Sequence, residues 1–281
     1  MPHEMIIIER HGRVGVIKFN RPDRLNALHN TMMGEMRQQI EEWNTDVSVG
    51  AVVLTGEGRA FCAGADMGGW RRQIERREEG GDGARRERRP ADQESWTQFA
   101  IRSKPIVCAI NGPAIGAGLT ITLPCDVRIA SPQARLAMRF VRVGVIPELA
   151  STHILAHIVG MGNALELMLS GRIISGEEAG RIGLVNRVVE ADRLVDDAIA
   201  TAAEIAFNPA DSLFAIKQLA WQNLSDGDIA EVSRREIREF VAAQQRPQFK
   251  EAVTAFREKR DPDFHKVEGA APRADVRPGP G

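Results

Sequence analysis

Two glycine-rich segments, each placed directly after an apolar run, are the parts of this sequence best suited to chemistry. We call residues 59–67 (RAFCAGADM) the first turn and residues 111–119 (NGPAIGAGL) the second turn. Glycine permits unusual dihedral angles and close approach of two backbones. A turn of this kind can present an unpaired N–H group, and at the start of a helix the dipole also favours negative charge. The alternative interpretation is two tight turns without a catalytic role, and either turn alone is weak support for a site.

One carboxylate, Glu148, lies just after Pro147 in the stretch GVIPELAST, at the beginning of a predicted apolar helix. A glutamate in a first helical turn often serves only to complement the helix dipole. Proton transfer is the other interpretation. For that role we expect burial to raise the pKa of Glu148 toward that of a useful base, while the helix N-terminus opposes the rise.

Other potentially reactive side chains favour structural roles. His153 and His157 are four residues apart, but no third ligand stands at a suitable spacing, so packing or interface roles are preferred over a metal site. Cys62, Cys108 and Cys125 sit inside apolar runs. Buried reduced thiols are therefore expected, without a disulfide framework.

The elements that must position these residues alternate between strand and helix. Residues 5–19 predict a hairpin around a turn at 11–13. Apolar residues recur every fourth position from residue 28 and predict a helix with one buried face; they are Met32, Met36 and Ile40. Short buried strands are predicted at 51–54 and 105–110, each followed by one of the two turns. This order predicts an α/β fold.

The pattern becomes helical beyond residue 147. Candidate helices cover 150–159, 163–169, 193–207, 213–223 and 229–243. We therefore expect a core over residues 1–200, a helical region over 201–267 and a disordered tail over 268–281. Residues 71–89 are rich in Arg and Glu and poor in apolar side chains, which predicts a mobile loop.

Composition narrows the function classes. A chain of 281 residues with 43% apolar content can bury one sizeable core. Its 37 basic and 38 acidic residues give a net charge of -1, which argues against nucleic acid or an anionic membrane as a partner. No signal peptide or membrane span is recognisable, so a cytoplasmic location is expected. An RNA-binding or non-catalytic role would depend on the arginines of 71–89, but interleaved glutamates and the lack of aromatic residues there weaken it.

Five segments, taken together and in this order, resemble the crotonase superfamily of enoyl-CoA hydratases and isomerases across nearly the whole chain. They are residues 25–28 (LNAL), 60–66 (AFCAGAD), 104–118 (KPIVCAINGPAIGAG), 125–130 (CDVRIA) and 171–189 (GRIISGEEAGRIGLVNRVV). The resemblance implies a spiral of ββα units with a C-terminal helical trimerisation region. It also implies a homotrimer, often doubled to a homohexamer, and an acyl-CoA substrate whose CoA moiety makes a separate cofactor unnecessary.

The resemblance also implies roles for individual residues. The backbone N–H groups of Ala65 and Ala117 would form an oxyanion hole for a thioester enolate, where one such donor is worth about 3 kcal/mol of barrier. Substrate and CoA contacts carry over to Arg24, Leu25, Ala27, Ala63, Asp66, Met67, Ile115, Gly116, Thr120, Phe140 and Lys259. For Arg24 and Lys259, solvated surface charge is an equally good interpretation.

The sequence departs from the family's hydratases at two positions. Thr120 and Phe140 stand where those enzymes carry two glutamates, and neither side chain can act as a base at neutral pH. Glu148 instead matches the position of the catalytic acid in some isomerases of the superfamily. The leading expectation is therefore enoyl-CoA double-bond isomerisation in fatty-acid or related acyl-CoA metabolism. Hydration with another water-positioning set, ring isomerisation and C–C bond cleavage remain alternatives.

Overall fold

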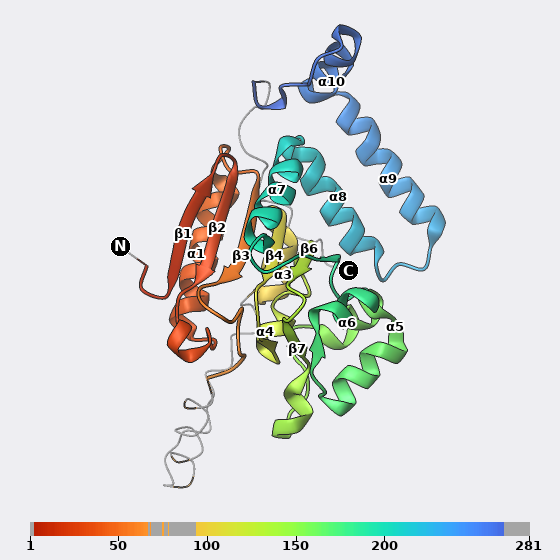
Figure 1. Ribbon diagram of the computed structural model, residues 1–281. Helices are drawn as coiled ribbons and strands as arrows, with labels where there is room; N and C mark the ends of the chain where they lie inside the picture. Colours follow the sequence, from red (N-terminus) through yellow and green to blue (C-terminus); the bar gives the residue numbers. More distant parts are fainter. Residues whose placement is uncertain (1–2, 67, 69–74, 76–77, 79–93, 267–281) are drawn as a thin grey trace.

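A six-stranded sheet forms the centre of the molecule (Figure 1), and the computed structural model describes residues 3–66, 68, 75, 78 and 94–266. Its strand order is β1 (Ile6–His11), β2 (Val14–Phe19), β3 (Ala51–Gly56), β4 (Ile106–Ile110), β6 (Val127–Ala130) and β9 (Arg187–Val188). The first two strands form the predicted antiparallel hairpin, and the remaining pairs are parallel. Parallel neighbours need crossover connections, and the two turns lie in these connections.

Helices cover both faces of this sheet, as the alternation of buried side chains requires. Val14 and Val16 point to one face with α7 (Leu194–Phe207), while Ile17 and Phe19 point to the other. On that second face lies α1 (Asn30–Thr45), whose predicted stripe of Met32, Met36 and Ile40 is fully buried. The α/β prediction is therefore confirmed.

A second, three-stranded sheet lies beside the first. It consists of β5 (Ala114–Ile115), β7 (Arg135–Ala137) and β8 (Ile174–Ser175). Next to it lie α4 (Ala117–Thr120) and α6 (Gly176–Arg181). The other short elements are α3 (Trp96–Arg102) and the 3-10 turns η1 (Pro22–Arg24) and η2 (Arg139–Val143). Because β5 lies inside the second turn, this small sheet fixes the turn against the molecule.

The helical C-terminal third agrees with the sequence pattern, with two differences. The two helices predicted over 150–159 and 163–169 are one element, α5 (Ser151–Ser170), interrupted at Gly160, whose φ of 76° and ψ of 155° are not helical. Next come α8 (Ala210–Asn223) and α9 (Ile229–Gln244). α10 (Pro247–Glu258) was not predicted from the sequence; it begins with proline, which suits a first helical position. After α10 the short η3 (Phe264–Lys266) ends the described chain.

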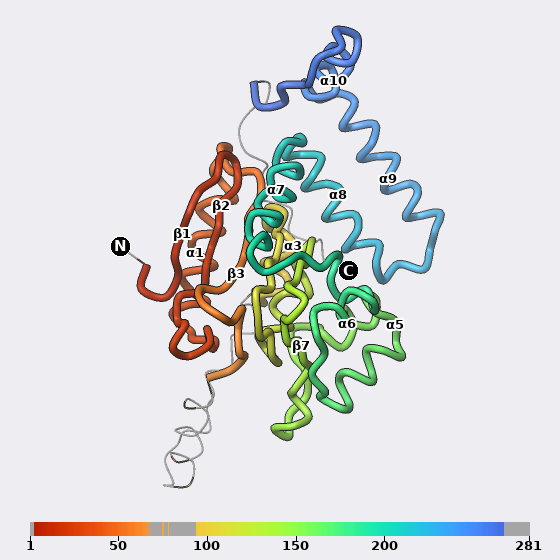
Figure 2. The backbone as a smooth tube through the Cα atoms, viewed as in Figure 1, coloured from red at the N-terminus to blue at the C-terminus, as the bar shows by residue number. Residues whose placement is uncertain are grey.

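Figure 2 shows that α9 and α10 stand away from the sheets, whereas α8 lies nearer to them and packs beside α3. The Lys217 ammonium forms a 2.7 Å ion pair with Asp126, and the Gln218 amide donates to the Ile101 carbonyl at 2.8 Å. Every residue of α9 is exposed or half-buried. Within the described part of the chain, no helix is long and apolar enough to span a membrane. The predicted mobile loop, apart from Glu75 and Glu78, and the predicted disordered tail lie outside the described residues.

Candidate functional site

The first turn is built on an exchange of backbone hydrogen bonds with residues 25–28. The Leu28 N–H donates to the Gly64 carbonyl at 2.8 Å, and the Ala63 N–H donates to the Leu25 carbonyl at 2.9 Å. Gly64 has a φ of +92°, and a Cβ placed on it would lie 2.4 Å from the Ile115 carbonyl oxygen. Only glycine fits there, because its missing side chain lets the second turn approach the first.

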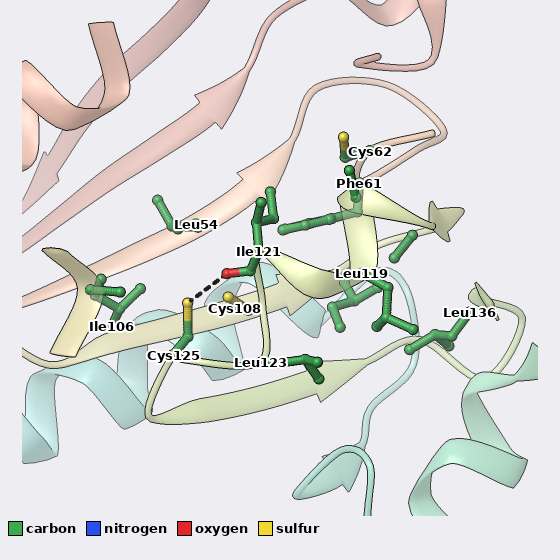
Figure 3. Close-up of a cluster of buried hydrophobic side chains, with 14 of the residues drawn as sticks. Leu54, Phe61, Cys62, Ile106, Cys108, Leu119, Ile121, Leu123, Cys125 and Leu136 are labelled. Carbon is green, nitrogen blue, oxygen red and sulfur yellow. Dashed lines mark hydrogen bonds between the residues drawn. The ribbon is translucent and has the colours of Figure 1, made fainter. Parts of the chain in front are cut away.

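The second turn packs onto the first through main-chain atoms. The Cys62 N–H donates to the Pro113 carbonyl at 2.9 Å, and the Ile115 N–H returns a 3.0 Å bond to the Cys62 carbonyl. A Cβ on Gly118 would stand 2.1 Å from that same Cys62 oxygen. The contact between the two turns is therefore as close as two backbones allow. Figure 3 shows Phe61 and Cys62 in one buried cluster with Leu119, Ile121 and Leu136.

The two predicted donors lie at the crossing of these turns. Ala65 is half-buried and pairs with Leu28 in an isolated bridge, and Ala117 is buried as the first residue of α4. Within residues 3–66, 68, 75, 78 and 94–266, neither backbone N–H has a hydrogen-bond acceptor. A partly buried N–H without a partner is uncommon and able to bind an anion. The expected contribution of a helix dipole at Ala117 is small, because α4 has only four residues.

Thr120 and Phe140 face the interior. Thr120 is fully buried, and its hydroxyl donates to the Ala117 carbonyl at 3.2 Å. Phe140 is buried in the main apolar core. Ile115 and Gly116 are half-buried in the second turn, where the Gly116 N–H donates to the Ala137 carbonyl at 2.7 Å. None of these side chains supplies a carboxylate.

Glu148 differs from what its sequence context indicated. It lies three residues before α5, which begins at Ser151, and its side chain is exposed in the single chain. The prediction that Glu148 is buried is therefore wrong for a single copy of the chain. The cause is the backbone, because Leu149 and Ala150 take φ values of 56° and 57° and turn the chain before the helix begins. Left-handed backbone costs a residue with a side chain about 1–2 kcal/mol, and such strain often accompanies functional sites.

Some residues expected to bind CoA come together. Arg21, to which no role was assigned from the sequence, donates to the Ala27 carbonyl at 2.5 Å and to the Asp66 carboxylate at 3.3 Å. These contacts join Ala27 and Asp66, while Leu25 and Ala63 are joined by their backbone bond. Asp66 also accepts a 3.0 Å bond from the Gly68 N–H. Met67 lies outside the described residues.

The two basic residues expected to contact the CoA phosphates, Arg24 and Lys259, lie far from each other in a single copy of the chain. The Arg24 side chain is 72% exposed and stands 3.7 Å from the Asp23 carboxylate. Lys259 is exposed at the end of α10, which Figure 1 places at the far end of the helical extension. Lys259 could join a site near the two turns only if another copy of the chain brought it there.

Asn26 is the residue that the sequence analysis overlooked. Its side chain is fully buried, donates to the carbonyls of Glu57 and Ala60 at 3.0 and 2.7 Å, and accepts from the Arg21 N–H at 2.8 Å. It ties residues 25–28 to the first turn. A buried asparagine in an otherwise apolar LNAL stretch was the available signal, since a buried amide needs several partners.

Cys62 and the two histidines do not extend the site. Burial raises the pKa of the Cys62 thiol to about 12, although hydrogen bonds from the backbone of Gly64 and Leu28 lower it in part. A protonated thiol is a poor nucleophile. The His153 and His157 rings stack at 4.2 Å between centroids, and within the described chain no three His, Cys, Asp or Glu side chains gather as a metal site would require.

Comparisons with known proteins agree on one family. A family profile described as enoyl-CoA hydratase/isomerase matches residues 9–267. The short-chain-enoyl-CoA hydratase of Clostridium acetobutylicum is 37% identical over 270 residues, covering 94% of this chain and 97% of the relative. The 2,3-dehydroadipyl-CoA hydratase of Escherichia coli is 32% identical over 260 residues, covering 92% and 98%.

Solved structures give the same result for the fold. An enoyl-CoA hydratase subunit from Geobacillus kaustophilus superposes with a TM-score of 0.81 at 33% identity, covering 93% of this chain and 98% of that one. An enoyl-CoA hydratase from Polaromonas sp. JS666 gives a TM-score of 0.81 at 26% identity, covering 92% and 98%. The expected crotonase architecture is therefore confirmed at the level of the fold.

Proposed function

Because the chain belongs to the enoyl-CoA hydratase/isomerase family, we propose that it moves the double bond of an enoyl-CoA thioester, converting a 3-enoyl-CoA into the 2-enoyl-CoA. The observation that carries this proposal is the pair of N–H groups at Ala65 and Ala117, for which the described residues provide no hydrogen-bond acceptor. They suit the oxygen of a thioester enolate, which gains negative charge when a proton leaves C2.

In the proposed reaction Glu148 takes the proton from C2 of the substrate. The resulting dienolate holds its negative charge on the thioester oxygen, which accepts hydrogen bonds from Ala65 and Ala117. The protonated Glu148 then returns the proton to C4, and the double bond comes to lie between C2 and C3. Each donor contributes about 3 kcal/mol if it resembles the best-measured oxyanion-hole donor. The thioester of CoA is the substrate itself, so no separate cofactor is proposed.

The CoA moiety is proposed to lie along residues 25–28 and the first turn. Leu25, Ala27 and Ala63 offer mostly backbone groups there, and Asp66 is oriented by Arg21. Arg24 and Lys259 are the proposed phosphate contacts. Because Lys259 lies on the helical extension, its contact is proposed to come from a neighbouring subunit.

Glu148→Gln tests the proton transfer, with Glu190→Gln as the matched control because Glu190 is another exposed glutamate. Conjugation of the 2-enoyl product is followed by ultraviolet absorbance with a 3-enoyl-CoA substrate. Glu148→Gln should lose about 10²- to 10⁴-fold in kcat and bind acyl-CoA normally, as expected when a general base is removed. Glu190→Gln should match the unaltered protein. Unchanged turnover in Glu148→Gln would overturn the isomerase proposal.

Hydration of a 2-enoyl-CoA is the second candidate, because relatives 32% and 37% identical to this chain are named hydratases. Water would then have to be held by groups other than Thr120 and Phe140, whose side chains lack a carboxylate. The same absorbance assay separates the reactions, since isomerisation creates the conjugated product and hydration consumes it. Loss of 2-enoyl-CoA, without its formation from 3-enoyl-CoA, would favour hydration.

Self-association is proposed as a trimer or a dimer of trimers, formed through the C-terminal helices of residues 201–267. Large apolar side chains are exposed along them: Ile216, Ile229, Ile237, Phe240, Val241, Phe249, Val253 and Phe256. A patch of this kind marks an interaction surface. Light scattering should give a trimer or hexamer mass, which Phe256→Glu should lower and Lys250→Glu, at another exposed position of α10, should not. A monomer at micromolar concentration would contradict this assembly.

A further inference from the structure

Two neighbouring residues of α3 hold two separate parts of the candidate site. The Trp96 indole N–H donates to the carbonyl of Ile121, which follows the last residue of α4, at 2.8 Å. The Thr97 hydroxyl donates to the carbonyl of Leu149, directly after Glu148, at 2.8 Å. The side chains of Trp96 and Thr97 are both buried. One turn of α3 therefore holds both the helix that begins at Ala117 and the turn that carries Glu148.

The turn at Glu148 has little support of its own. The Ser151 N–H closes it with a 3.0 Å bond to the Glu148 carbonyl, around two residues of positive φ. The next helix, α5, begins at Ser151, and its N-cap residue Ala150 provides no side-chain hydrogen bond. Within the described part of the chain, the buried Ser151 hydroxyl has no hydrogen-bond partner. Among the described residues, Thr97 provides the one side-chain hydrogen bond to residues 148–151. Leu149 packs against the main apolar core, and Thr97 adds the directional contact that fixes the Leu149 carbonyl.

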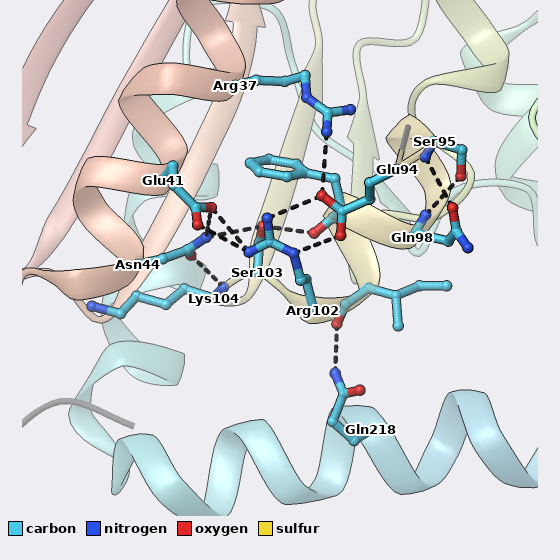
Figure 4. A network of polar contacts seen from close by, with 12 residues as sticks. Arg37, Glu41, Asn44, Glu94, Ser95, Gln98, Arg102, Ser103, Lys104 and Gln218 are labelled. Carbon is cyan, nitrogen blue, oxygen red and sulfur yellow. Dashed lines mark hydrogen bonds and ion pairs between the residues drawn. The ribbon is translucent and has the colours of Figure 1, made fainter. Parts of the chain in front are cut away.

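The helix that carries Thr97 is itself firmly fixed, as Figure 4 shows for the polar contacts around it. Ser95 and Gln98 form a reciprocal capping box at its start. Glu94 accepts from Arg37 at 3.3 Å and from Arg102 at 2.6 Å. The guanidinium groups of Arg37 and Arg102 also stand 4.4 and 4.8 Å from the centre of the Phe99 ring, within the range of cation–π attraction. A helix held in this way is a rigid support for the groups bound to it.

We propose that Thr97 is a positioning residue for the reaction. Its hydroxyl fixes the Leu149 carbonyl, and thereby places Glu148 relative to the N–H groups of Ala65 and Ala117. This inference rests on the proposed function, in which Glu148 moves the proton. A small displacement of a reacting group can cost about 100-fold in rate without weakening binding. Thr97 therefore acts on kcat through Glu148, and it touches no substrate itself.

The test compares Thr97→Val, Thr97→Ser and Glu148→Gln in the full chain, using a 3-enoyl-CoA as substrate. Thr97→Val keeps the shape of the side chain but removes the donor, so kcat should fall about 10- to 100-fold, with KM within about twofold of its original value. Thr97→Ser retains the hydroxyl and should restore most of kcat. If the valine variant does not fold, Thr97→Ala replaces it in the test. It should likewise lower kcat and leave KM nearly unchanged.

Thr55→Val is the matched control. Thr55 is also buried, and its hydroxyl donates to the Ala109 carbonyl at 2.9 Å on the central sheet, away from the turn at Glu148. The Thr55→Val variant should lower the melting temperature about as much as Thr97→Val does and leave kcat unchanged. Unchanged kcat in the Thr97 variants, together with a large loss in Glu148→Gln, overturns this inference and leaves the proposed function standing. Unchanged kcat in Glu148→Gln overturns both.

Discussion

The Asn26 side chain donates a 2.7 Å hydrogen bond to the Ala60 carbonyl, joining two loops 34 residues apart in the chain. The same amide donates to the Glu57 carbonyl, and its oxygen accepts from the Arg21 N–H. Asn26 also has a φ of 54°, which asparagine tolerates better than most residues. One side chain thus maintains both its own loop and the first turn.

Asn26→Asp should therefore destabilise the protein strongly. The aspartate has no amide donors for the carbonyls of Glu57 and Ala60 and would bury a charge beside them. The loss should be about 1–3 kcal/mol or more of unfolding free energy, measured by urea denaturation. Asn208→Ala, at an exposed asparagine that donates to the Glu204 carbonyl, should cost less than about 1 kcal/mol. Equal midpoints for the two variants would show that Asn26 does not maintain this contact.

Gly118→Ala should disrupt the crossing of the two turns. The added methyl would lie 2.1 Å from the Cys62 carbonyl oxygen, so one backbone must move. Overpacking of this kind costs about 1–3 kcal/mol, and movement of the turns should also remove enoyl-CoA turnover. Gly34→Ala is the control, because a Cβ there meets no atom of the described residues within 4 Å and Gly34 lies inside α1. It should raise stability by about 1 kcal/mol. A similar melting temperature for both variants would contradict the proposed packing.

Ala150→Gly should behave unlike an ordinary alanine-to-glycine change. Ala150 has a φ of 57°, which glycine adopts without steric cost. Relief of that strain should offset the entropy that glycine loses on folding, so the melting temperature should be unchanged or higher. Ala203→Gly, at an exposed position inside α7, should lose about 1 kcal/mol. Equal losses in a thermal unfolding measurement would show that the turn at Glu148 is not strained in solution.

The Cys62 thiol should resist alkylation in the native protein over the pH range in which free cysteines react. Burial raises its pKa to about 12, so the thiolate stays scarce as pH rises from 7 to 9. An unperturbed thiol ionises near pH 8.5 and would react readily at pH 9. Mass spectrometry after iodoacetamide treatment at pH 9 should find Cys62 unmodified in the native chain and alkylated after denaturation. Rapid labelling of native Cys62 would show that the thiol is accessible.

Much of the architecture could be predicted from the sequence, because it depends on short-range patterns. The four-residue spacing of Met32, Met36 and Ile40 requires a helix with one buried face, and α1 has that face. The glycine-rich turns were likewise recognisable from composition and order. Their contact distance was not, since it depends on how Gly64 meets Ile115 and how Gly118 meets Cys62 in the folded chain.

The local pattern was misleading near Glu148. An apolar stretch after Pro147 indicated a helix start, but the left-handed residues Leu149 and Ala150 delay the helix to Ser151 and leave Glu148 exposed. The bond from Thr97 to Leu149 could not be predicted either. It joins residues 52 positions apart, and no periodicity in the sequence encodes such a pair.

The use of main-chain donors determines which mutations could abolish the proposed activity. Proline is the one standard residue without a backbone N–H, so only replacement by proline deletes the donor at Ala65 or Ala117 outright. A single base change turns any alanine codon into a proline codon. Ala117 is the first residue of α4, a position where helices accept proline readily. Ala117→Pro would therefore remove half of the proposed oxyanion hole at a position where the helix itself tolerates proline, and an activity screen would measure that loss directly.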